Sequence, residues 1–123
     1  MKKERYIQIK DFLKGLITGT EWERHVFTVG GCVRDEIMGL EMRTILRIGL
    51  RHGHDSLVLG ALGCGAFCNP PSHIAQLFHE VFEEPEFKNK YRLISFAILA
   101  DHNAHRSHNP EGNYLPFVKE FYQ

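Results

Sequence analysis

Three glycines, Gly60, Gly63 and Gly65, lie in the stretch Leu57-Val-Leu-Gly-Ala-Leu-Gly-Cys-Gly-Ala-Phe-Cys-Asn-Pro-Pro71. Glycine allows a positive φ and lets a backbone approach a ligand closely. Free backbone amides in such a loop, together with the positive end of a following helix, can bind a phosphate group. The stretch therefore predicts an anion-binding loop, with a tight turn that binds nothing as the alternative.

A second cluster could bind a metal ion. His102, His105 and His108 recur every third residue within Asp101–Pro110. Zinc is held by histidine, cysteine and carboxylate side chains, usually on a rigid scaffold. Here Arg106 would repel the cation within a predicted loop, so we expect no metal site. The polar segment still follows a strand, which places it beside the usual ligand crevice of an α/β sheet.

Cysteine chemistry is the third candidate. Cys64 near an anion site could become a nucleophile if its pKa were lowered. Three residues separate it from Cys68, and the sequence places no base beside it. We therefore expect a small, buried, unreactive thiol and no catalytic residue. An odd total of three cysteines, without scaffold-like spacing, favours reduced thiols and a cytoplasmic location.

The elements around the glycines follow from apolar patterns. Leu57 to Leu62 has the composition of a buried parallel strand, and Tyr91 to Ala100 is a second such run. Ser72 is a good N-cap for the helix between them. The apolar stripe of that helix is predicted to be core and comprises Ile74, Leu77, Phe78, Val81 and Phe82. Helix termination is expected at residues 83–86, and the aromatic tail from Tyr114 is expected to pack back onto the body.

The first part of the chain repeats the order strand, glycine turn, helix. An amphipathic helix is predicted over residues 6–16, a strand over residues 25–29 and a helix over residues 32–38 that Gly39 closes. A second or continued helix spans residues 41–54. It places Arg43, Arg47 and Arg51 on one face, which favours a solvated face over an anion-binding stripe.

The length and the charge of the chain limit the class of protein to which it can belong. A chain of 123 residues with 43% hydrophobic residues predicts one globular domain. Lys+Arg 15 against Asp+Glu 15 gives a formal net charge of +0, so no global field favours nucleic acid or a membrane surface. The sequence has no apolar run of transmembrane length and no signal-peptide pattern. No cofactor is indicated.

From about Arg43 onward, the sequence resembles the carboxyl-terminal half of the microbial poly(ADP-ribose) glycohydrolase-like family, which has a macrodomain fold. Ile-Leu-Arg-Ile-Gly-Leu50, the Leu57–Pro71 stretch and Ile-Ser-Phe-Ala-Ile-Leu99 carry the resemblance. It implies that the loop wraps the diphosphate of ADP-ribose. The ligand-binding positions that it implies are backbone contacts from Gly63, Cys64, Gly65 and Ala66, the ring of Phe67, and Asn69.

Catalysis in that family uses a run of glycines followed by Gln-Glu-Glu, and no segment here matches that signature. Without a general acid for the glycosidic bond, hydrolysis by this chain alone is not expected.

The segment Val26-Phe-Thr-Val-Gly-Gly-Cys-Val-Arg-Asp-Glu-Ile-Met-Gly-Leu40 resembles the start of the tRNA nucleotidyltransferase and poly(A) polymerase head domain. It implies a second phosphate site at Gly30, Gly31, Arg34 and Asp35. The metal-binding Asp-x-Asp pair of that family is absent, so no polymerase activity is expected.

Together these patterns predict a partial macrodomain-like α/β fold with a small, mainly parallel sheet of about three strands flanked by helices. One compact domain is expected over residues 1–123, with a nucleotidyltransferase-like segment at 1–42 and a macrodomain-like half at 43–123. The expected function is binding of ADP-ribose or a related nucleotide. The alternatives are a glycohydrolase completed by a partner chain and a structural remnant without a ligand. Poorly covered sheet edges and faces also predict a homodimer.

Overall fold

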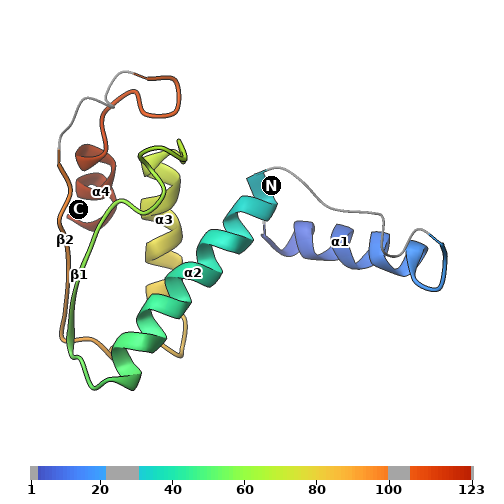
Figure 1. Ribbon diagram of the computed structural model, residues 1–123, viewed down its shortest axis with the longest axis horizontal. Coiled ribbons are helices and arrows are strands. Elements are labelled where there is room, and N and C mark those ends of the chain that lie inside the picture. Colours follow the sequence, from blue (N-terminus) through green and yellow to red (C-terminus); the bar gives the residue numbers. More distant parts are fainter. Residues whose placement is uncertain (1–2, 22–30, 100–105, 123) are drawn as a thin grey trace. The chain divides into compact units, whose positions relative to one another are not determined.

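A computed structural model describes residues 3–21, 31–99 and 106–122. Contacts divide the chain into two units, Met1–Met38 and Gly39–Gln123, which are described separately below. The elements, in chain order, are α1 (Lys3–Ile17), α2 (Gly31–Arg51), β1 (Ser56–Leu59), α3 (Pro71–Phe82), β2 (Leu93–Phe96) and α4 (Tyr114–Phe121) (Figure 1). None of the described helices is both long and apolar enough to cross a membrane.

The first unit contains α1, which confirms the helix predicted over residues 6–16. Lys10 Nζ lies 2.9 Å from Glu36 Oε1, so an ion pair joins α1 to the first part of α2. The strand predicted over residues 25–29 lies outside the described residues. The apolar side chains of α1 that the structure describes are exposed, among them Ile9, Phe12, Leu13 and Leu16.

The prediction that Gly39 ends a helix is wrong, because α2 runs through it without a break. Glycine within a helix costs only about 1 kcal/mol relative to alanine, which neighbouring helix-forming residues can offset. The helix instead ends before Gly53, whose φ is 76°. The amide of His54 donates to Gly49 O and that of Gly53 to Leu50 O, the pattern of a Schellman C-cap.

In the second unit, β1 and β2 form a parallel pair with α3 as the crossover between them. Leu57 is opposite Ile94, and Leu59 is opposite Phe96. Both strands are shorter than the apolar runs that predicted them. The fold is α/β as expected, and the described part of the sheet has two strands.

Helices α3 and α4 cover one face of this sheet (Figure 1). The ring of Phe96 lies 5.3 Å from that of Phe78 in α3, and 4.9 and 5.0 Å from those of Phe117 and Phe121 in α4. The predicted core stripe is confirmed at its centre, since Ile74, Phe78 and Val81 are buried. The aromatic tail packs back onto the body, as expected.

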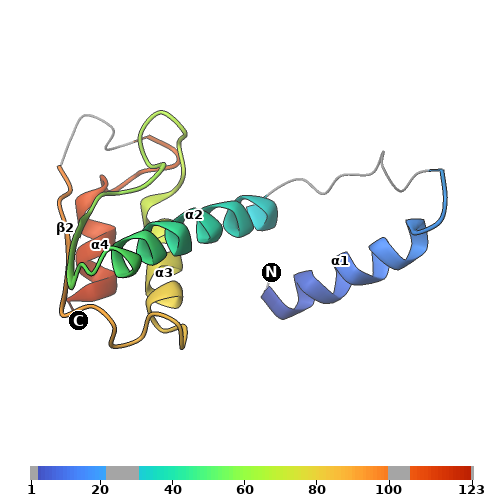
Figure 2. The same cartoon turned by 60° about the horizontal axis from the view of Figure 1, so that its bottom comes forward.

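The other face of the sheet is open, which corrects the prediction of fully buried strands. Val58 is 74% exposed and Leu93 is 52% exposed. Both views show α3 and α4 on the same side of the strands (Figure 2). The apolar run therefore reflected one half-buried face and one exposed apolar face.

Ser72 does not cap α3, contrary to prediction. The helix begins at Pro71, and Pro70 occupies the N-cap position with φ −62° and ψ 124° and no side-chain cap. Proline suits the first helical position because its fixed φ is already helical and its missing N–H would have no partner there. The helix ends at Phe82, as predicted.

Candidate functional site

The glycine loop, residues Gly60 to Asn69, joins the end of β1 to the start of α3. Backbone hydrogen bonds hold its shape: the amide of Cys64 donates to Ala61 O at 3.1 Å, and that of Asn69 donates to Gly63 O at 3.0 Å. A third bond runs from the amide of Cys68 to Gly65 O at 3.0 Å. Two successive backbone turns therefore shape the loop.

The three glycines play different roles. Gly63 has φ 72°, a conformation that favours glycine. Gly60 needs no such freedom, since an added Cβ would lie at ordinary contact distance, 4.0 Å from Ala97 O. An added Cβ at Gly65 would meet no atom within 4 Å, so this glycine leaves open space above the loop.

The loop offers hydrogen-bond donors that are unused within the described part of the chain. There, the amides of Gly65, Ala66 and Phe67 donate no hydrogen bond, and all three residues are exposed. The amide of Gly63 is likewise without an acceptor among the described residues. Consecutive amides of this kind form a concavity that favours an anion.

The start of α3 contributes fewer donors than the sequence suggested. Pro70 and Pro71 have no N–H, and the amides of His73 and Ile74 both donate to Pro70 O at 3.1 Å. The loop amides, rather than the helix terminus, therefore supply most of the donors.

Cys64 is fully buried in the loop, which confirms the prediction of a buried thiol. Burial raises the pKa of this thiol to about 12, because the thiolate would lose its hydration. Its Sγ donates weakly to Leu62 O at 3.7 Å. A thiol in this state stays protonated near neutral pH and is a poor nucleophile.

Of the remaining loop positions that the resemblance implied, Phe67 is 85% exposed and Asn69 is buried. The loop thus presents three exposed amides and an exposed aromatic ring together. No charged residue occurs between Leu57 and Ser72.

The segment after β2 belongs to the same end of the sheet, because the strands are parallel. Here Asn109 is fully buried and its Nδ2 donates to Oδ1 of Asn113 at 2.5 Å. Oδ1 of Asn109 and Nε2 of His108 are buried and have no hydrogen-bond partner among the residues that the structure describes. Sequence reasoning missed this polar pair, although the Asn-Pro-Glu-Gly-Asn turn marks it.

His102 and His105 lie outside the described residues. Within the described ranges, no three His, Cys, Asp or Glu side chains gather closely enough to hold a metal ion.

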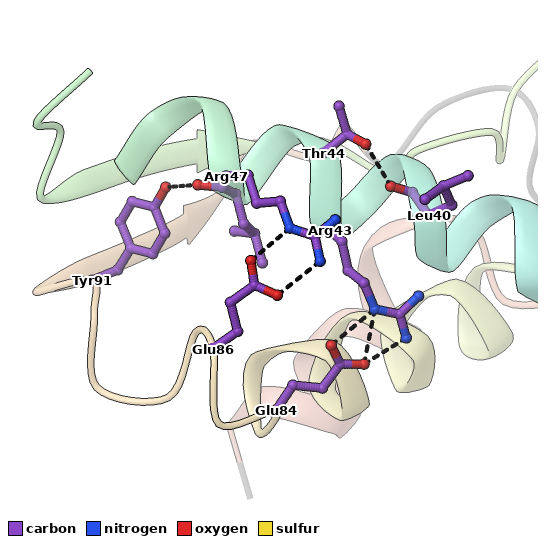
Figure 3. A network of polar contacts seen from close by, with 8 residues as sticks. Leu40, Arg43, Thr44, Arg47, Glu84, Glu86 and Tyr91 are labelled. Carbon is purple, nitrogen blue, oxygen red and sulfur yellow. Dashed lines mark hydrogen bonds and ion pairs between the residues drawn. The ribbon is translucent and has the colours of Figure 1, made fainter. Parts of the chain in front are cut away.

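The opposite end of the sheet contains the arginines of α2 (Figure 3). Arg43 makes a two-pronged contact with Glu84, in which Nε lies 2.8 Å from Oε2. Arg47 pairs with Glu86, with Nη2 2.8 Å from Oε2. The hydrogen bonds to Glu84 raise the pKa of Arg43, and the hydrogen bonds from Arg47 lower the pKa of the Glu86 carboxyl.

The spacing of Arg43, Arg47 and Arg51 was interpreted either as a solvated helix face or as an anion-binding stripe, and the ion pairs bear on both interpretations. Arg43 is half-buried, unlike the solvated residue that was expected, whereas Arg47 and Arg51 are exposed. Arg43 and Arg47 each have a carboxylate partner, so both join α2 to the loop between α3 and β2.

Tyr91 closes the same end of the sheet. Its hydroxyl donates to Leu46 O at 2.6 Å (Figure 3). Gly49 makes room for this contact, because a Cβ there would overlap the Tyr91 hydroxyl and lie 3.2 Å from Leu57 Cδ2. Gly49 of α2 is therefore the point where this helix contacts both β1, through Leu57, and the loop before β2, through Tyr91. Sequence reasoning did not single out this glycine.

The second predicted phosphate site is described only in part. Gly30 lies outside the described residues, and Gly31 begins α2. Arg34 is exposed and Asp35 is half-buried. This site remains a prediction.

No protein-family model matches the sequence, and no curated protein is similar to it. Solved structures of poly(ADP-ribose) glycohydrolase from Deinococcus radiodurans in complex with ADP-ribose are similar. One has a TM-score of 0.60 and 25% identity over 89% of this chain and 38% of that chain. Another has a TM-score of 0.59 and 29% identity over 72% of this chain and 33% of that chain. The structure of a point mutant of the same enzyme has a TM-score of 0.58 and 29% identity over 70% of this chain and 32% of that chain.

The chain thus spans about a third of the length of these glycohydrolases. None of the comparisons supports the nucleotidyltransferase resemblance. The described fold is α/β and partly macrodomain-like, and this chain shares it with a segment of bacterial poly(ADP-ribose) glycohydrolases that were crystallised with ADP-ribose.

Proposed function

We propose that this chain binds ADP-ribose, with the glycine loop holding the diphosphate. The observation that carries the proposal is the row of exposed amides at Gly65, Ala66 and Phe67, which have no acceptor in the described part of the chain. The similar solved proteins are complexes with ADP-ribose, which supports this ligand over other anions.

The chemistry of the loop also sets the character of binding. Because residues 57–72 include no charged side chain, the phosphates would be held by oriented N–H dipoles rather than by lysine or arginine. Affinity should then depend only weakly on salt, since screening acts mainly on exposed full charges. The exposed ring of Phe67 offers a surface for a base or a ribose.

Calorimetric titration with ADP-ribose, and with ATP for comparison, tests the proposal. Heat with ADP-ribose and weaker or no heat with ATP is the expected result. The absence of heat with either ligand would favour the structural remnant without a ligand.

Gly65→Val provides the matching variant. Its new side chain would occupy the open space above the loop, where a Cβ meets no atom within 4 Å, so binding should be lost while the fold persists. Gly15→Val in α1 is the control, because a Cβ there also meets no atom within 4 Å. Equal affinity in the two variants would exclude the loop as the site.

A second candidate is glycoside hydrolysis completed by a partner chain. The observation that favours it is the match to about a third of a glycohydrolase. Because the Gln-Glu-Glu signature is absent here, the chain by itself should release no ADP-ribose from a modified protein. Release by the purified chain would show that a general acid exists elsewhere in it.

A further inference from the structure

The turn that leads into α4, residues 106–113, is held in shape by a buried pair of asparagines. Asn109 is fully buried, and its Nδ2 donates to Oδ1 of Asn113 at 2.5 Å. Asn113 is only 6% exposed. The amide of Asn109 also donates to Arg106 O at 2.9 Å, which closes the first part of the turn. The asparagine pair therefore ties the turn to the first residue position of α4.

This pair uses hydrogen-bonding groups that could otherwise stabilise the helix. Asn113 is the N-cap residue of α4, a position where an asparagine oxygen usually accepts from a helix amide. Here its side chain caps no amide and accepts from Asn109 instead. Oδ1 of Asn109 is buried and has no hydrogen-bond partner among the described residues, which also costs stability. Such costs are typical of functional sites rather than of groups selected for folding alone.

The turn lies at the carboxyl end of the sheet, where open α/β sheets bind their ligands. Both views show it next to the glycine loop (Figures 1 and 2). The segments that follow the two strands also run together at their start. The amide of Ala97 donates to Leu59 O at 2.8 Å, and a Cβ on Gly60 would lie 4.0 Å from Ala97 O. A ligand that extends beyond the loop amides would therefore reach the turn.

The exposed side chains of the turn suit a nucleoside. Arg106 and Ser107 are both exposed. A guanidinium plane can stack on an adenine ring, and a hydroxyl can exchange hydrogen bonds with the hydroxyls of a ribose. The bond from the Asn109 amide to Arg106 O fixes the backbone from which these side chains extend.

We propose that Asn109 and Asn113 are positioning residues for ADP-ribose. Their hydrogen bond fixes the turn so that Arg106 and Ser107 contact the nucleoside part of the ligand, while the glycine loop holds the diphosphate. This inference rests on the proposed function and adds the part of the site that distinguishes ADP-ribose from a bare diphosphate.

NMR titrations of the full chain with ADP-ribose and with inorganic pyrophosphate, followed at the Gly65 amide, test the proposal. Asn109→Ala and Asn113→Ala should each raise the dissociation constant for ADP-ribose about fivefold, because the turn is no longer held in place. The dissociation constant for pyrophosphate should not change. Asn113→Asp is the matched control: its carboxylate still accepts from Nδ2 of Asn109, so the affinity for ADP-ribose should stay at the native value.

The two ligands separate positioning from a purely structural role. Equal weakening of both ligands in the two alanine variants would overturn the proposal, as would unchanged affinity for ADP-ribose in both. If Asn113→Asp weakened ADP-ribose as much as Asn113→Ala, the hydrogen bond would not be the cause. A native chain that bound ADP-ribose no more tightly than pyrophosphate would overturn this inference and leave the proposed function standing. A native chain that bound neither would overturn both.

Discussion

The two ends of the small sheet differ in how their polar groups are used. At the amino end of the strands, Arg43 pairs with Glu84, Arg47 pairs with Glu86, and the Tyr91 hydroxyl donates to a carbonyl of α2 (Figure 3). At the carboxyl end, the glycine loop has no charged side chain and leaves several amides without acceptors in the described structure.

This difference separates stability from binding. Groups that already have partners at the amino end connect α2 to the loop before β2, and their loss should weaken the fold. The loop amides without acceptors at the carboxyl end contribute little to folding and can donate hydrogen bonds to a ligand instead. Substitutions at the two ends should therefore affect different measurements.

The largest effect is expected from Gly49→Ala at the amino end. The new methyl group would overlap the Tyr91 hydroxyl and press on Leu57, so overpacking should cost about 2 kcal/mol of unfolding free energy. Chemical denaturation measures this loss. Gly15→Ala in α1 is the control and should not destabilise the chain, because a Cβ there meets no atom within 4 Å.

At the carboxyl end, Phe67→Ala should weaken ADP-ribose binding about tenfold, because stacking of an aromatic ring on a base contributes on the order of 1–3 kcal/mol. Stability should not change, since the ring is 85% exposed. Tyr122→Ala removes a comparably exposed ring, 84%, outside the loop. If calorimetry gave the same affinity for both variants, Phe67 would not contact the ligand.

At the amino end of the strands, Glu84→Gln should have a smaller effect on the unfolding free energy. It removes the charge opposite the half-buried guanidinium of Arg43, which should cost about 1 kcal/mol of stability. Glu86→Gln is the matched control and should cost less, because its ion pair with Arg47 is exposed. A change in ADP-ribose affinity in Glu84→Gln would break the proposed separation of the two ends.

The smallest effect concerns pH. Because burial raises the pKa of Cys64 to about 12, the unfolded chain loses the thiol proton first as pH rises. The contribution of Cys64 to the unfolding free energy is therefore fully present at a pH below the ordinary pKa of a thiol. It decreases as the pH rises above that pKa, by about 1 kcal/mol or less up to about pH 9.5.

Chemical denaturation of the native chain and of Cys64→Ser, at neutral pH and at about pH 9.5, isolates this contribution. Burial also raises the pKa of Tyr91, in the same direction, so the variant should keep a shallower slope rather than none. Identical slopes would mean that Cys64 is not buried in solution.

Local patterns predicted the elements that local physics decides. The apolar runs located both strands, and the stripe through Ile74, Phe78 and Val81 located the inner side of α3. Predictions that depended on one residue were less successful. Gly39 did not end α2, because Gly53 provides the left-handed C-cap, and Ser72 did not cap α3, because Pro71 fits the first helical position.

Long-range partners were beyond prediction. Arg43 and Glu84 are 41 positions apart, so helical spacing could show a face of arginines but not the carboxylates opposite it. The exposure of Val58 follows from helices packing on one sheet face only, which an apolar run does not reveal. The glycine loop could be located from sequence, but the free amides depend on which turns form.

The most direct test of the central claim is a titration of the ¹⁵N-labelled chain with ADP-ribose, followed by NMR at each backbone amide. We expect the largest shifts at Gly63, Gly65, Ala66 and Phe67, whose amides gain phosphate acceptors, and small shifts around Arg43 and Arg47. Shifts centred on those arginines, or an unchanged spectrum at saturating ADP-ribose, would contradict it.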